Sequence, residues 1–173
     1  MQTRDDTTSS WFDWAAKHLE DWKAQEDAWR HVFTSDALGA IEYARLTACS
    51  MKHEYVGAEH LLAGLLKSDY GMVPTLLRTS GVDVPTLEHE MEAAGSKTLD
   101  PDARWPRCAT PRFSRIIAGA KEEAAIHGNG RVGSGHLFLA LLREPDGLPA
   151  SIFRKYHIDL ERIRQAILEE IKP

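Results

Sequence analysis

The chain contains the same sequence pattern twice, and this duplication restricts its possible folds more than any other feature. Residues 57–67 read GAEHLLAGLLK and residues 133–143 read GSGHLFLALLR, an offset of 76 positions. The same offset matches Thr34 with Thr110 and Ile41 with Ile117, with no insertion between the matched blocks. A unit of about 60 residues buries little apolar surface by itself. We therefore expect the two copies to pack against each other around one pseudo-twofold axis.

Each copy has the periodicity of short amphipathic helices. Ala37, Ile41, Ala44 and Ala48 follow one another at spacings of three and four residues, which places them on one helical face. Thr34 precedes this stripe as a candidate N-cap, and in the second copy Thr110 is followed by a proline at the first helical position. No segment alternates as a strand would. The sequence predicts an all-α fold of two tandem four-helix repeats, eight helices in all.

The repeats leave two segments outside them. We place the first repeat at residues 33–91, a proline-containing connector at 92–108 and the second repeat at 109–173. Residues 1–32 form an N-terminal extension that contains four of the five tryptophans, and we expect an extra helix there. Trp11, Trp22 and Trp29 either dock a partner protein or pack this helix onto the repeats.

Composition excludes several classes of protein. The 173 residues include 26 Asp and Glu against 21 Lys and Arg, a net charge of −5, which disfavours a nucleic-acid-binding protein. No stretch approaches the roughly 18 apolar residues of a membrane span, and the N-terminus lacks the pattern of a signal peptide. Two cysteines are too few for a disulfide framework. We expect a cytoplasmic protein that binds neither nucleic acid nor membrane.

The motifs of common catalytic sites are missing from the sequence. There is no phosphate-binding G-x-x-x-x-G-K-[ST] loop, no H-E-x-x-H, no C-x-x-C and no G-x-S-x-G. His60 and His136 recur at the same position just inside a helix start, which favours packed structural histidines over ligands or bases. His53 would share a helical face with His60 only if one helix ran through Gly57, which we do not expect. We predict a protein that is not an enzyme and has no cofactor or metal site.

The duplicated motifs carry a resemblance to a known family. The first repeat contains Phe33-Thr34 followed by residues 55–66, YVGAEHLLAGLL. The second repeat contains Thr110-Pro111-Arg112 followed by residues 132–137, VGSGHL. These motifs resemble the N-terminal domain of Clp chaperones, closest to the ClpC type. The resemblance covers about residues 33–171. It implies an eight-helix domain that binds substrates and adaptor proteins for an unfoldase. Because no AAA+ ATPase module follows in this sequence, the chain resembles a stand-alone N-domain protein.

For the ClpC type, the resemblance also implies recognition of arginine-phosphorylated protein. Carried over residue by residue, the first repeat keeps Thr34 for the phosphate and Glu59 for the guanidinium, although Asp36 in the same helical turn would repel a phosphate. The second repeat keeps Thr110 and adds Arg112, but Gly135 stands where the first repeat has Glu59, so this pocket is degenerate. The alternative is that both threonines only cap helices and that Glu59 only complements a helix dipole.

Three functional hypotheses follow. The first is an accessory or adaptor-like module that captures client proteins or docks on Clp ATPase or protease components. The second is a decoy that sequesters peptides or the cyclic-peptide natural products directed at Clp N-domains. It ranks lower because Ala109 replaces the apolar side chain that Phe33 supplies in the first repeat. The third is a structural or oligomerisation domain that uses the tryptophan-rich extension.

Overall fold

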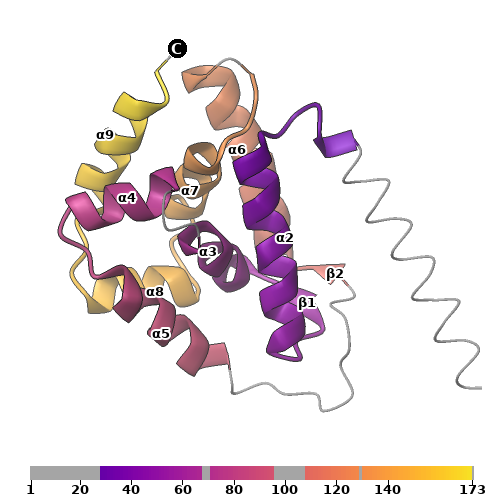
Figure 1. Cartoon of the computed structure of the whole chain (residues 1–173), viewed down its shortest axis with the longest axis vertical. Coiled ribbons are helices and arrows are strands. Elements are labelled where there is room, and N and C mark those ends of the chain that lie inside the picture. Colours follow the sequence, from indigo (N-terminus) through magenta and orange to yellow (C-terminus); the bar gives the residue numbers. More distant parts are fainter. Residues whose placement is uncertain (1–27, 68–70, 96–107, 129, 173) are drawn as a thin grey trace, which may run out of the picture.

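The fold was determined as a computed structural model, which describes residues 28–67, 71–95, 108–128 and 130–172. Within these residues the chain forms eight α-helices and two strands of two residues each (Figure 1). The helices are α2 (Ser35–Ser50), α3 (Ala58–Leu66), α4 (Met72–Thr79), α5 (Val84–Gly95), α6 (Pro111–His127), α7 (Ser134–Leu142), α8 (Leu148–Lys155) and α9 (Leu160–Glu170). The strands are β1 (Tyr55–Val56) and β2 (Cys108–Ala109). The predicted all-α class, with four helices per repeat, is confirmed.

Local sequence explains where the long helices begin. The hydroxyl of Thr110 accepts a hydrogen bond from the Phe113 amide at 3.1 Å, and Pro111 occupies the first helical position of α6. Thr34 is the N-cap residue of α2, but its hydroxyl accepts no bond from the helix. The hydroxyl of Thr34 instead contacts the carboxylate of Asp36 and the carbonyl of Val132.

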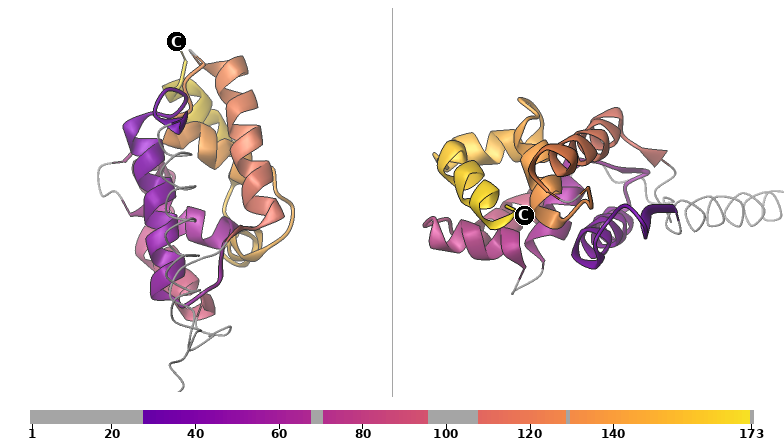
Figure 2. Two further views of the ribbon diagram at one scale, coloured as in Figure 1. Left: turned by 90° about the vertical axis from the view of Figure 1, so that its right-hand side faces the viewer. Right: turned by 90° about the horizontal axis from the view of Figure 1, so that it is seen from above.

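The two repeats pack together through their second helices. Helix α2 packs along α3 and α6 along α7, while α3 and α7 contact each other and also the long helix of the opposite repeat. The two views of Figure 2 show this arrangement, with α4 and α9 side by side at one end of the molecule. The bulk of the core is apolar and fully buried; its largest members include Phe33, Phe113, Phe138, Leu61, Leu137 and Ile163. Both repeats therefore share one core.

Short parallel ladders cross between the repeats. Val56 of β1 pairs with Ala109 of β2, and Phe33 forms an isolated bridge with Val132. Each ladder joins the residues before the first helix of one repeat to the residues before the second helix of the other. The start of α2 consequently lies beside the start of α7, and the start of α6 lies beside the start of α3.

Candidate functional site

The crossed ladders group the predicted site residues differently from the sequence-based pairing. The amide of Thr34 donates to the carbonyl of Val132 at 2.9 Å, and the amide of Thr110 donates to the carbonyl of Val56 at the same distance. Thr34 is thus grouped with Gly135 at one junction, and Thr110 with Glu59 at the other. We call these the α2/α7 site (Thr34, Asp36 and residues 133–135) and the α6/α3 site (Thr110 and residues 57–59). The sequence analysis paired Thr34 with Glu59 within one repeat, whereas the ladders place Thr34 beside the start of α7.

In the α2/α7 site, a carboxylate of the chain itself occupies the helix start. One oxygen of Asp36 accepts a hydrogen bond from the amide of Ser134, the first residue of α7, at 3.1 Å. The other oxygen accepts from the hydroxyl of Thr34. Burial alone would raise the pKa of Asp36, but the hydrogen bonds from Ser134 and Thr34 outweigh it and hold that pKa below its ordinary value. The carboxylate is therefore charged at neutral pH and takes the place of an external anion.

The same site has no room for a guanidinium-binding carboxylate at Gly135. A Cβ atom added there would lie 2.8 Å from the sulfur of Met72 and 3.1–3.2 Å from methyl groups of Ile171 and Ile167. Helices α4 and α9 therefore fill the space that a side chain on α7 would need. The α2/α7 site lacks both halves of a phosphoarginine pocket, since its anion position is filled and its carboxylate position is closed.

The α6/α3 site differs from the α2/α7 site in both respects. The first turn of α6 contains no acidic residue, and the hydroxyl of Thr110 lies at the helix start, where backbone amides favour an anion. Across the ladder, the carboxylate of Glu59 folds back over Gly57 at the start of α3, with Oε1 3.6 Å from Nδ1 of His60. Its side chain remains 21% exposed. A cation can therefore reach Glu59 from solvent.

Arg112 does not extend freely into this site. Its Nε lies 3.3 Å from Oε2 of Glu144. The carboxylate of Glu144 also accepts two hydrogen bonds from the guanidinium of Arg115, at 2.8 and 3.2 Å. The guanidinium of Arg112 packs over Gly147, within 3.0 Å of the position that a Cβ there would take. Arg112 thus belongs to an ion cluster at the junction of α7 and α8, and any role in phosphate binding would require it to leave Glu144.

The recurrent histidines are hydrogen-bonded structural residues, as the sequence analysis favoured. Nδ1 of His60 accepts from the amide of Gly57 at 2.9 Å, and Nδ1 of His136 accepts from the amide of Gly133 at 3.0 Å. Burial, together with the charge of His53, lowers the pKa of His60 to about 4. Burial also lowers the pKa of His136.

A contact between His53 and His60 was not predicted. Nδ1 of His53 lies 2.7 Å from Nε2 of His60, although no helix connects the two residues. Because Nδ1 of His60 already accepts from Gly57, its Nε2 carries the proton and donates to His53. A turn and strand β1 fold His53 back against α3, and the sequence spacing carries no signal for this.

The tryptophans proposed for docking lie mostly outside the described residues. Trp29 is half-buried, and its ring lies 5.3 Å from that of Phe33 in a tilted arrangement. The carbonyl of Trp29 accepts from the Phe33 amide at 2.7 Å. Trp29 therefore packs on the core of its own chain. Trp11 and Trp22, with most of the expected N-terminal helix, fall in residues 1–27, outside the described part.

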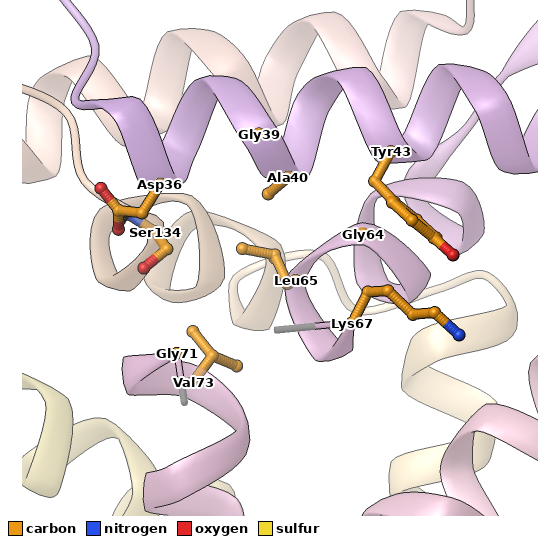
Figure 3. Close-up of a pocket in the computed structure, with 10 residues that line it drawn as sticks. All are labelled: Asp36, Gly39, Ala40, Tyr43, Gly64, Leu65, Lys67, Gly71, Val73 and Ser134. Atoms are coloured by element: carbon orange, nitrogen blue, oxygen red, sulfur yellow. Dashed lines mark hydrogen bonds between the residues drawn. The ribbon is translucent and has the colours of Figure 1, made fainter. Parts of the chain in front are cut away.

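A hollow of about 360 Å³ lies between α2, α3 and α4 and shares Asp36 and Ser134 with the α2/α7 site (Figure 3). Its apolar walls come from Ala40 on α2, Leu65 on α3 and Val73 on α4. Asp36 lies at one end beside Ser134, and Tyr43 and Lys67 lie at the other. The nitrogen of Lys67 is 5.6 Å from the centre of the Tyr43 ring. The hollow thus has an anionic end, an apolar middle and a cationic end.

Two further observations concern residues 28–67, 71–95, 108–128 and 130–172. No three histidine, cysteine, aspartate or glutamate side chains in this part of the chain gather as a metal site would require. None of its helices has the length and apolar character needed to cross a bilayer.

Comparison with known proteins decides the family. The model of the Clp repeat (R) N-terminal domain matches residues 32–102 and 109–173. The chain belongs to this family. A probable ATP-dependent Clp protease ATP-binding subunit of Chlamydia pneumoniae is 31% identical to this Clp N-domain over 140 residues, which is 81% of the chain. The chloroplastic chaperone protein ClpC of Pisum sativum is 30% identical over 142 residues. The chain spans only 17% and 15% of the length of these two relatives.

Solved structures show the same fold. The Hsp104 N-terminal domain from Candida albicans superposes with a TM-score of 0.70 at 18% identity, over 80% of this chain and 90% of that one. The N-domain of ClpV, solved in complex with a VipB peptide, superposes with a TM-score of 0.59 at 22% identity, over 79% and 87%. At these identities the likeness establishes the eight-helix Clp N-domain architecture.

Proposed function

We propose that this Clp N-domain is a non-catalytic module that binds client proteins or adaptors of a Clp ATPase, and that its α6/α3 site binds phosphoarginine. The binding role is supported by the family itself and by the ClpV N-domain, whose structure holds a peptide of VipB. The choice of site rests on one observation. The crossed ladder brings Thr110 and Glu59, from different repeats, to the same junction.

The chemistry of the ligand matches the two halves of this junction. The phosphoryl group is an anion that backbone amides at the start of α6 and the hydroxyl of Thr110 can hold. The guanidinium is a planar donor that a carboxylate such as Glu59 binds with two parallel hydrogen bonds. Since Asp36 already occupies the α2/α7 site, we expect one phosphoarginine per chain rather than two.

Calorimetric titration of the chain with phosphoarginine tests this proposal. We expect a stoichiometry near one, with affinity at least tenfold weaker for both Glu59→Gln and Thr110→Val. Glu122→Gln serves as the matched control, because Glu122 lies on α6 with a side chain 64% exposed and should not affect binding. Thermal melts of each variant separate loss of binding from loss of fold.

Two results would contradict the assignment. Absence of binding by a folded wild-type chain would remove phosphoarginine as the ligand. Binding that survives Glu59→Gln but is lost on changing Thr34 would move the site to the α2/α7 junction. The partner half of the proposal is tested separately, by whether immobilised chain retains a purified Clp ATPase or its adaptors.

A further inference from the structure

The hollow between α2, α3 and α4 exists because a small residue stands where the equivalent helix of the second repeat has a large one. Gly39 lines the hollow, and a Cβ atom added there would have no neighbour within 4 Å. At the offset of 76, Gly39 corresponds to Arg115, and Asp36 corresponds to Arg112. The first repeat therefore lacks two long side chains that the second repeat has at this place.

In the second repeat two arginine side chains lie at the corresponding place. The guanidinium of Arg112 covers Gly147, the equivalent of Gly71 in the hollow. Both Arg112 and Arg115 pair with the carboxylate of Glu144, whose side chain is largely buried. This region of the fold thus accommodates arginine stems with a carboxylate partner, and the second repeat supplies both.

The first repeat has apolar walls at this place and a carboxylate, Asp36, at the position of Arg112, but no arginine. We propose that the hollow receives an unmodified arginine side chain from a partner protein, with its guanidinium at Asp36. The stem of that arginine would lie along Ala40, Leu65 and Val73, which are apolar and face the hollow (Figure 3).

The charges at the two ends support this occupant. Asp36 places a negative charge at one end of the hollow, and this charge attracts a guanidinium. Lys67 at the far end repels a second cation and fixes the direction in which the arginine enters. A phosphorylated arginine is disfavoured here, because its phosphoryl group would approach the carboxylate. The site is therefore independent of the α6/α3 site and of its ligand.

The test is a titration of the full ¹⁵N-labelled chain with the peptide acetyl-Ala-Arg-Ala-amide, followed by amide chemical shifts. We expect saturable shifts at Gly39, Gly64 and Gly71, and at least tenfold weaker binding when citrulline replaces arginine in the peptide. Citrulline keeps the shape of the side chain but removes its charge. Equal binding of both peptides, or shifts scattered over the surface, would overturn the proposal.

Variants of the chain give a second, independent readout. Gly39→Arg supplies from α2 the arginine that Arg115 supplies from α6, and should reduce binding of the peptide at least tenfold. Ala118→Arg adds the same charge at an exposed position on α6 and should leave binding unchanged. Asp36→Asn should weaken binding while keeping an acceptor for Ser134. Wild-type affinity in a folded Gly39→Arg variant would refute the assignment.

Failure of this proposal and failure of the phosphoarginine proposal are distinguishable. A peptide containing phosphoarginine should shift the amides of Gly57 and Glu59 and should be sensitive to Glu59→Gln. The arginine peptide should be insensitive to that substitution. If Glu59→Gln abolishes binding of the arginine peptide as well, both peptides use the α6/α3 site and the hollow is not an arginine site.

Discussion

Mild acid should destabilise this domain because His60 is buried in its neutral form. Only 1% of the residue is exposed, and burial with the neighbouring His53 lowers its pKa from 6.5 to about 4. The unfolded chain therefore takes up a proton at His60 below pH 6.5, whereas the folded protein takes it up only near pH 4. The free energy of unfolding is highest above pH 6.5 and falls as the pH decreases through this window.

The size of the loss follows from the two pKa values of His60. It amounts to about 3 kcal/mol between neutral pH and pH values below 4, and to about 2 kcal/mol by pH 5. His136 adds a loss of the same sign, because burial lowers its pKa as well. A loss of this size is a large part of the stability of a typical domain, about 5–15 kcal/mol.

Urea denaturation at pH 7.5 and at pH 5 measures this loss. His60→Asn keeps an acceptor for the Gly57 amide but does not titrate, so its pH dependence should be smaller by about 2 kcal/mol. His157→Asn is the control, because His157 is exposed and its positive φ of 50° suits asparagine. Equal pH dependence in the wild type and in His60→Asn would refute the reasoning.

Three alanine substitutions of glycine should differ in sign, because the space around each glycine differs. Gly64→Ala should destabilise the fold by about 3 kcal/mol or more, since its Cβ would collide with the backbone carbonyl of Ala40. Gly135→Ala should cost about 1–3 kcal/mol, because its Cβ would press on the movable side chain of Met72. Gly39→Ala should instead stabilise by about 0.5–1 kcal/mol, since it lies within α2 with open space beside it. Thermal or urea unfolding of the three variants measures these values, and the same sign for all three would contradict the packing described.

Much of the fold could be predicted because its determinants are local. The 76-residue offset and the spacing of Ala37, Ile41, Ala44 and Ala48 indicate a duplicated helical protein, and all four residues are buried on one face of α2. Thr110 with Pro111 predicts the start of α6, which the structure confirms. Each of these signals acts within a few residues of the chain, where side-chain type and backbone geometry are directly linked.

The candidate site could be predicted only as a set of residues and not as an arrangement. Thr34 looks like the N-cap of its own helix, yet its hydroxyl contacts Asp36 and the carbonyl of Val132, 98 residues away. Glu59 and Thr110 belong to different repeats, and only the pairing of β1 with β2 groups them. A two-residue strand is too short to leave a recognisable pattern in the sequence.

By itself, the sequence determined that this chain is a duplicated, all-helical Clp N-domain, because periodicity, capping residues and the repeat offset are written along the chain. Only the tertiary structure decided which helix starts meet, that Asp36 fills one junction while Glu59 remains accessible at the other, and that Gly39 leaves a hollow. The reason is physical. Helix formation depends on neighbours three and four residues apart, whereas these junctions depend on how two similar surfaces pack across the pseudo-twofold axis.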